Sequence, residues 1–271
     1  MVKSIIFTIS LILIATGCQD GSNPLDPQPK SLGQMMNLST SNPLKPFLDR
    51  YSAADVIGVV DLSKIQYSIY NGSAQPVDAT TFGATATIRK ASNLDQGASM
   101  ENLWVNTGLL VPFAPGQYRW EAAQPSSLTV NFGSGWNLVK ADSGPDYPAF
   151  RDSVQFGSAI VLTSTTRGTT ISKASSYTVS WSGSGTDFVD ISLRRDLTYV
   201  DPPFVGPQGI LKYSDNTGTV VLSASELSAL PNGKYRLSVT QYEPEYVTMP
   251  GGKKLVVLGR SAHEVDVMVS N

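Results

Sequence analysis

The chain has 271 residues, only 15% of them charged, and its formal net charge is −2. Because basic residues form no patch or run, nucleic acid is not an expected partner. Cysteine occurs once, which excludes an intrachain disulfide. The chain is long enough for one large or two ordinary domains, held together by core burial. Abundant Gly, Ser, Thr and Pro, common β-branched residues and the lack of long helical periodicity predict an all-β fold.

The N-terminal segment has the layout of a secretory signal peptide. Lys3 supplies a positive charge, residues 4–14 are almost continuously apolar, and small residues follow at 15–17, before Cys18. An apolar run of roughly 11 residues covers only about half of a ~30 Å hydrocarbon core. The run is therefore predicted to be the hydrophobic region of a signal and not a membrane span.

The sequence Ala15-Thr16-Gly17-Cys18 resembles the lipobox of bacterial lipoproteins, although Ala15 stands where Leu is more usual. The resemblance implies that the Cys18 thiol is diacylglycerated, that the signal is cut before it, and that the new N-terminus is acylated. The expected partner is then the membrane, reached through an N-terminal lipid anchor. Gln19 stands where Asp would be an inner-membrane retention signal, which favours the outer membrane. The alternative is an ordinary signal peptide with a chance Cys.

Residues 19–50 are predicted to be a flexible tether. They contain several Pro, Asn and Asp residues, and their apolar residues are isolated. Such a segment does not bury enough surface to offset the entropy of ordering. A flexible chain of this length spans roughly 30 Å, enough to lift a domain clear of lipid headgroups.

Residues 51–158 are predicted to form a first β-sandwich domain. Ile65, Tyr67 and Ile69 alternate with polar residues, and Asn71-Gly72 is a turn signal. Further segments of strand-like pattern are 84–90, 103–110, 117–122, 128–132, 136–139 and 153–156.

Residues 159–271 contain about seven short strands with regular turn signals, typical of an immunoglobulin-like sandwich. Apolar residues alternate at 177–181, 189–193 and 235–239. These segments, with the corner at Leu230, resemble immunoglobulin or fibronectin type III-like modules of bacterial surface lipoproteins. The resemblance implies that Tyr235 is a tyrosine-corner residue; it implies a fold and not an activity. The sequence thus predicts two tandem antiparallel β-sandwich domains, and whether they arose by duplication stays open.

Residues able to do chemistry are few. The only His, His263, is expected to be a surface residue on the last strand, and a zinc site needs several His or Cys ligands. Asp215-Asn216-Thr217-Gly218 is expected to be a plain turn. Nothing in the sequence pairs two carboxylates as a glycosidase requires. The candidates are Glu121, Asp142, Asp146, Glu243 and Glu245. We therefore expect no enzyme, no metal and no cofactor.

Exposed aromatic side chains are the remaining indication of a binding site. Trp136 follows a Gly-rich loop and Tyr147 lies in a Pro-rich loop, so these two are the best candidates for ligand contact. The alternative for both is packing in the core or at its rim, because large aromatics supply much of the burial in a sandwich. Trp181 is in phase with core residues and is expected to be buried. The sequence predicts a membrane-anchored envelope lipoprotein that acts as a non-enzymatic binding or structural module, with an envelope protein or a glycan as partner. The alternative is a carbohydrate-binding or weakly hydrolytic auxiliary protein using loop carboxylates and aromatics.

Overall fold

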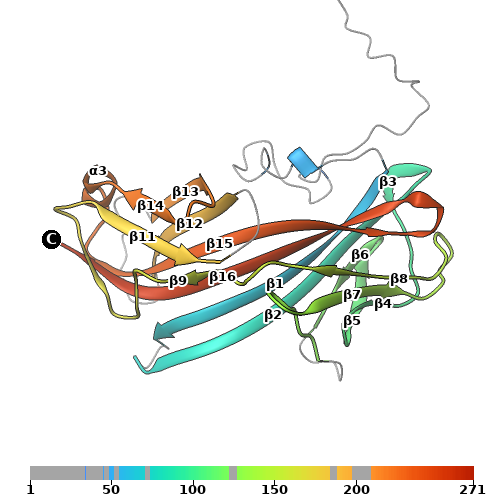
Figure 1. Ribbon diagram of the computed structural model, residues 1–271, viewed down its shortest axis with the longest axis horizontal. Coiled ribbons are helices and arrows are strands. Elements are labelled where there is room, and N and C mark those ends of the chain that lie inside the picture. Colours follow the sequence, from blue (N-terminus) through green and yellow to red (C-terminus); the bar gives the residue numbers. More distant parts are fainter. Residues whose placement is uncertain are drawn as a thin grey trace, which may run out of the picture.

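The computed structural model describes residues 34, 45, 49–51, 55–70, 74–121, 127–183, 188–196 and 209–271. Cys18, the rest of the predicted signal, most of the predicted tether and the Asn71-Gly72 turn lie outside the described residues. The described part is elongated, with its longest strands running along the long axis (Figure 1).

Strands dominate the structure, which confirms the predicted all-β sandwich fold. The strands are β1 (Val56–Tyr70), β2 (Pro76–Lys90), β3 (Asn93–Gly97), β4 (Leu103–Val105), β5 (Gly108–Ala114), β6 (Gln117–Arg119), β7 (Trp136–Ala141), β8 (Phe150–Gln155), β9 (Val161–Leu162), β10 (Thr170–Ser172), β11 (Tyr177–Ser182), β12 (Phe188–Arg195), β13 (Gly209–Asp215), β14 (Thr219–Leu222), β15 (Gly233–Thr248) and β16 (Lys254–Ser270). The short helical elements are η1 (Asp49–Tyr51), α3 (Ala224–Ser228) and η3 (Pro250–Gly252).

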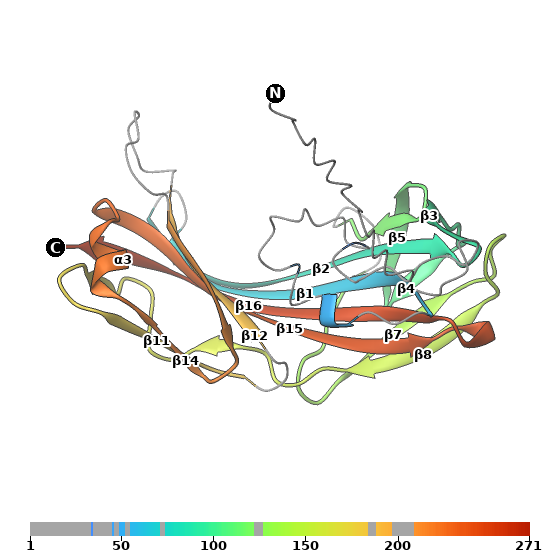
Figure 2. The same cartoon turned by 90° about the horizontal axis from the view of Figure 1, so that it is seen from above.

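One sheet runs through the whole described structure. Its strand order is β13-β12-β15-β16-β1-β2-β6-β5-β4-β7-β8, and a smaller sheet has the order β14-β11-β9. The centre of the large sheet is the parallel pair β1 and β16, flanked by their antiparallel partners β2 and β15. These four strands have 15 to 17 residues each and span roughly 50 Å. Figure 2 shows them connecting the two ends of the molecule.

The segment 235–239, expected to be a short strand, is part of the long strand β15. The apolar segments 255–258 and 265–269 both belong to the long strand β16. Pro244 lies within β15 although proline cannot donate a ladder hydrogen bond. Among the described residues, β12 pairs with β15 only as far as Gln241, so the strand neighbour of Pro244 there is β16.

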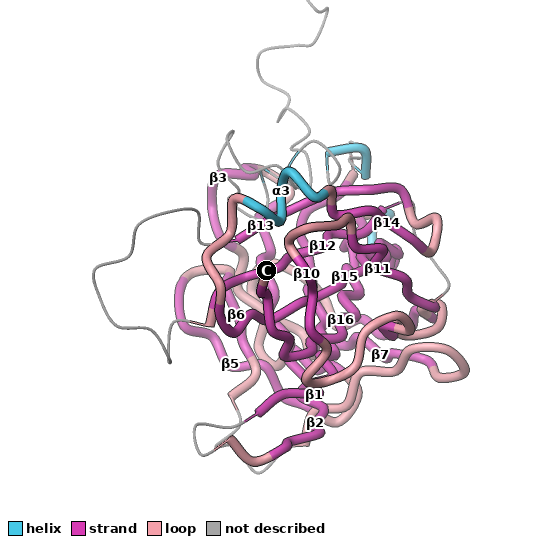
Figure 3. The backbone as a smooth tube through the Cα atoms, turned by 90° about the vertical axis from the view of Figure 1, so that its left-hand side faces the viewer, coloured by secondary structure: helices cyan, strands magenta, loops and turns pink. Residues whose placement is uncertain are grey.

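Two hydrophobic cores lie on the inner face of the large sheet. The second core, at the C-terminal end, is enclosed between that face and the small sheet, and it contains Trp181, as expected. Figure 3, viewed from that end, shows β11 and β14 beside β15 and β16. The first core forms where the large sheet curls back until Asp152 of β8 accepts a hydrogen bond from Thr248 N of β15, at 2.9 Å.

The long strands contribute to both cores. β15 supplies Tyr235, Leu237 and Val239 to the second core, and its later residue Val247 to the first. Otherwise the two cores divide along the sequence between Phe156 and Ile160, close to the expected boundary at 158/159. A continuous sheet joins them, so an arrangement of two separate domains stays a prediction.

Between the two cores the inner face of β15 and β16 is polar, and it holds the segment that connects β8 to β9. The backbone N–H groups of this segment donate to the sheet: Gly157 to the Glu243 carboxylate at 2.7 and 2.8 Å, Ile160 to Ser261 Oγ at 3.0 Å, and Leu162 to His263 Nδ1 at 2.9 Å. In addition, Gln241 Nε2 donates to Ser158 O at 2.8 Å. Side chains therefore satisfy backbone groups that would otherwise be buried without partners.

Two local predictions have different outcomes. Tyr235 is fully buried and its hydroxyl donates to Pro231 O at 2.9 Å, the contact of a tyrosine corner. The second prediction is a short helical turn at 225–230 with Ser225 as a possible N-cap; the N-cap of α3 instead lies two residues earlier. Its N-cap is Ser223 and not Ser225, because Ser223 and Glu226 form a reciprocal capping box for which Ser225 has no acidic partner at the right spacing.

Candidate functional site

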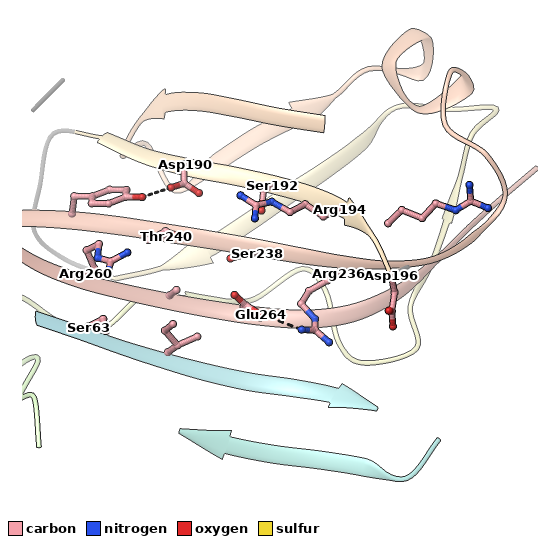
Figure 4. Close-up of a pocket in the computed structure, with 14 residues that line it drawn as sticks. Ser63, Asp190, Ser192, Arg194, Asp196, Arg236, Ser238, Thr240, Arg260 and Glu264 are labelled. Carbon is pink, nitrogen blue, oxygen red and sulfur yellow. Dashed lines mark hydrogen bonds and ion pairs between the residues drawn. The ribbon is translucent and has the colours of Figure 1, made fainter. Parts of the chain in front are cut away.

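A polar groove lies on the outer face of the large sheet, opposite the second core (Figure 4). Its volume is about 450 Å³, and it crosses β12, β15, β16 and β1. The residues that line it are Ser63, Ile65, Asp190, Ser192, Arg194, Arg195, Asp196, Arg236, Ser238, Thr240, Tyr242, Arg260, Ala262 and Glu264.

Strand alternation positions these side chains. In β12, Val189, Ile191 and Leu193 pack into the second core, so Asp190, Ser192 and Arg194 point to the opposite face. β15 and β16 alternate in the same way. Strand register then brings residues of β12 and β15 side by side as the pairs Asp190–Thr240, Ser192–Ser238 and Arg194–Arg236.

The floor of the groove is made of small residues. Ser192 and Ser238 are 5% and 8% exposed, and Ala262 and Ser63 continue the floor on β16 and β1. Longer side chains stand on both sides of these residues, so the difference in side-chain length creates the hollow. Within the described part of the chain, the hydroxyls of Ser192 and Ser238 make no hydrogen bond.

The wall nearer the first core is fixed by two contacts. The Tyr242 hydroxyl donates to Asp190 Oδ2 at 2.5 Å, and Arg260 Nε lies 2.8 Å from Asp61 Oδ1. Burial raises the pKa of the Asp190 carboxyl, while the hydrogen bond from Tyr242 acts in the opposite direction. Burial also raises the pKa of Asp61, partly offset by the Arg260 guanidinium.

The opposite wall contains one paired and one unpaired arginine. Arg236 Nε is 3.1 Å from Asp266 Oδ1, and its Nη1 is 3.7 Å from Glu264 Oε2. Its cross-strand neighbour Arg194 is exposed and forms no ion pair or hydrogen bond among the described residues. Burial raises the pKa of Glu264, and the charges of Arg236 and Arg194 oppose this shift.

The groove is suited to non-covalent binding of a small polar ligand. Its walls are held by ion pairs and hydrogen bonds, and its floor presents hydroxyls that both donate and accept. Over the described ranges, no group of three or more His, Cys, Asp or Glu is placed to hold a metal ion. No helix within the same ranges is long and apolar enough to cross a membrane.

The two aromatics proposed from the sequence lie elsewhere, at the first core. Trp136 is 61% exposed at the start of β7, as expected. The prediction that Tyr147 is exposed is wrong. Its side chain is 7% exposed, and its hydroxyl donates to Arg89 O at 2.7 Å. The Pro-rich loop therefore packs its aromatic ring against the first core. Trp136 lies at the open end of the β7–β8 hairpin, opposite Gln155, whereas Tyr147 lies in the loop that closes its other end, so the two residues form no common site.

Four of the five candidate carboxylates have a partner of their own. Glu245 has none among the described residues, and its charge adds to the raised pKa of Glu243. Glu243 accepts from Gly157 N, and burial raises its pKa. Asp146 accepts from Ser99 N at 2.7 Å, a bond that lowers its pKa. Asp142 accepts from Asn102, and Glu121 pairs with Arg119. These contacts assign the four side chains to local structure.

The remaining predictions concern His263 and the 215–218 turn. His263 is half-buried and lies on the inner face, and it accepts a hydrogen bond, so the expected surface position is wrong. The reason is that β16 is an interior strand, with β15 and β1 on its two sides. The 215–218 segment is a turn, closed by Thr217 N donating to Asp215 O at 2.8 Å.

The groove itself was not predicted from the sequence. Alternation identified the apolar halves of β12, β15 and β16, and the polar halves are equally visible as Asp190, Ser192 and Arg194 or Arg236 and Ser238. The register between the strands could not be predicted from the sequence. Ser192 and Ser238 become neighbours only because β12 and β15, which are distant in sequence, pair with each other.

Comparisons with known proteins add little to this geometry. No protein-family model and no curated protein matches the chain. Among solved structures, the Fcho1 Mu homology domain of Danio rerio with bound Eps15 peptide is similar, with 13% identity and a TM-score of 0.25. The match covers 80% of this chain and 98% of that chain. At this level of similarity no property of that domain is transferred, and the function is argued from the groove.

Proposed function

We propose that this protein is a lipid-anchored lipoprotein of a bacterial envelope, and that its folded part is a non-enzymatic binding module whose ligand occupies the groove. The observation that carries the binding role is the pair of hydroxyls of Ser192 and Ser238, which have no hydrogen-bond partner among the described residues, at the bottom of a groove with fixed charged walls. The lipobox-like sequence ending in Cys18 supports the anchor.

The anchor would act through the acyl chains on Cys18. Each buried CH₂ contributes about 0.8 kcal/mol, and two or more chains make membrane attachment stable. Gln19 supports an outer-membrane destination. The predicted tether would then hold the β-structure away from the lipid surface.

The groove is suited to binding because its charged groups are already in place. Asp190 is held by Tyr242, Arg260 by Asp61, and Arg236 by Asp266. Side chains that are ordered before binding lose less entropy when a ligand arrives.

Cell fractionation tests the anchor. Cys18→Ala should remove the lipid and move the protein from the membrane to the soluble fraction, whereas Thr16→Ser, which keeps a small residue, should leave the distribution unchanged. Mass spectrometry of the mature chain should find an acylated Cys18 at the N-terminus. A free, unmodified thiol or an intact leader contradicts the anchor.

Filling the groove tests the binding role. Ser238→Phe places a ring in the hollow, and Ser153→Phe places the same ring on β8, outside the groove. Capture of glycans and proteins from envelope extracts by the full chain should be lost in the first variant and kept in the second. Equal capture by both variants contradicts binding in the groove.

A further inference from the structure

The floor hydroxyls indicate that the groove binds polar groups. Ser192 and Ser238 form a cross-strand pair, both are more than nine-tenths buried, and neither hydroxyl has a partner in the described chain. A hydroxyl both donates and accepts hydrogen bonds, so a ligand in the groove can bond to each of the two. The ligand should therefore carry hydroxyl or carboxylate groups at this position.

The next cross-strand pair adds a positive charge with no ion-pair partner among the described residues. Arg236 pairs with Asp266 and Glu264, whereas Arg194 beside it has no described carboxylate within ion-pair distance and acts on Asp190 and Glu264 only from farther away. Arginine presents a planar set of donors that matches the geometry of a carboxylate or a phosphate. Arg194 therefore provides a position for one acidic group, directly next to the floor hydroxyls.

The remaining walls supply acceptors. Asp190 and Glu264 are carboxylates with elevated pKa values in partly buried positions, and Glu264 lies in register with Ser238 on the side away from Ser192. The Glu264 carboxylate is itself paired with Arg236, at 3.7 Å. Carboxylates placed in this way are suited to accept hydrogen bonds from ligand hydroxyls.

From this arrangement we infer that the groove binds an anionic sugar residue. The acidic group of the sugar pairs with Arg194, and its ring hydroxyls bond to Ser192, Ser238 and the neighbouring carboxylates. The inference rests on the proposed function, because it names the ligand class of the same groove. A volume of about 450 Å³ is within the usual range for small-molecule sites.

The lining favours a sugar over an acidic peptide. The apolar residues that reach the groove are Ile65 and Ala262, and the one aromatic, Tyr242, is 6% exposed with its hydroxyl committed to Asp190. Peptide recognition generally depends on apolar or aromatic anchors buried in pockets. Hydroxyl and charged groups instead match the many donors and acceptors of a sugar ring.

Titration calorimetry on the detergent-solubilised full-length protein tests the inference. The probes are glucuronate for a carboxylate, glucose 6-phosphate for a phosphate, glucose, inorganic phosphate and a tetra-glutamate peptide. At least one anionic sugar should bind about tenfold or more tightly than glucose or phosphate, since charge-assisted hydrogen bonds are the strong ones. Which of the two binds identifies the acidic group. No binding of either sugar, equal binding of glucose, or tighter binding of the peptide overturns the inference.

Variants assign the binding to the residues. Arg194→Gln should weaken binding of the anionic sugar about tenfold or more, remove its advantage over glucose and flatten its dependence on salt. Ser192→Ala with Ser238→Ala should weaken binding without loss of fold stability, because these hydroxyls have no partner to lose. The matched controls on β8, Arg151→Gln and Ser153→Ala, should bind as the native protein does. Unchanged binding in both groove variants overturns the assignment.

The two proposals fail separately. If Ser238→Phe abolishes capture from envelope extracts while neither anionic sugar binds, the groove is a binding site and only the ligand class is wrong.

Discussion

At the scale of single residues, a hydrogen bond to His263 determines which of its ring nitrogens carries no proton. Nδ1 accepts from Leu162 N, so that nitrogen carries no proton in the folded protein. Burial lowers the pKa of His263 below its ordinary 6.5, and the Asp78 carboxylate nearby only partly opposes the shift. A proton on Nδ1 would replace an attractive contact with two facing donors.

This gives a pH dependence of stability. Between the folded-state pKa of His263 and 6.5, the unfolded chain binds more protons than the folded one. The free energy of unfolding therefore rises with pH through this window, and the stabilisation is lost as pH falls through 6.5 towards the folded value. Denaturant titrations between pH 5 and pH 8 should show this slope in the native protein and a reduced slope in His263→Gln, whose amide oxygen still accepts from Leu162. Identical slopes contradict the prediction.

Tyr235 supports a second residue-scale prediction. Its hydroxyl donates to Pro231 O while its ring is fully buried in the second core. Tyr235→Phe keeps the ring, so it should lower the free energy of unfolding by about 1 kcal/mol, the usual net value of one hydrogen bond. Tyr67→Phe is the control, because Tyr67 is half-buried and forms no hydrogen bond among the described residues. Chemical denaturation of both variants checks the difference.

At the scale of elements, β16 passes from one core to the other at Gly259. A Cβ at this position would lie 2.8 Å from Cε1 of the Phe156 ring, the last residue of the first core before the connection to β9. Glycine thus allows the ring to lie directly on the strand backbone.

Gly259→Ala should therefore lower the free energy of unfolding by about 1–3 kcal/mol, the usual cost of overpacking a core. Phe156→Leu in the same chain should recover part of this loss, since the smaller side chain makes room for the new methyl group. Additive effects of the two substitutions in a double-mutant cycle contradict the contact as the cause.

Local pattern predicted much of the element scale. Alternation located the apolar residues of β11, β12 and β15, and Pro231 with Tyr235 was sufficient to predict the tyrosine corner. Alternation did not predict that β15 continues through Pro244, since that depends on its pairing with β16. The groove was missed for a related reason: its pairs, such as Ser192 with Ser238, are set by long-range strand register.

At the scale of the whole molecule, the first core depends on residues from the end of the chain. Val247, Met249, Leu255 and Val257 come from β15, β16 and the connection between them, and they are buried among residues of the first half. The same strands provide the parallel neighbour of β1. No local pattern predicts a pairing between residues some 200 positions apart, so the sequence favoured two consecutive units.

A fragment of residues 51–158 should therefore not fold by itself. It lacks four core side chains and leaves one edge of β1 unpaired, and losses of 2–5 kcal/mol are typical for each large core side chain removed. Circular dichroism should show no cooperative thermal transition, and a hydrophobic dye should bind. The full chain, as the control, should unfold cooperatively. A sharp transition in the fragment would instead establish the first predicted domain as an independent unit.

The parallel pairing of β1 with β16 also has a mechanical consequence. A pull on β1 from its N-terminal end, where the proposed anchor lies, combined with a pull on β16 from its C-terminal end would load these two adjacent parallel strands in opposite directions along their axes. Such a force loads the hydrogen bonds between them in shear, so that many must break together, whereas a force across the strands would unzip them one by one. The long parallel pair would therefore resist extension of the molecule along its strands.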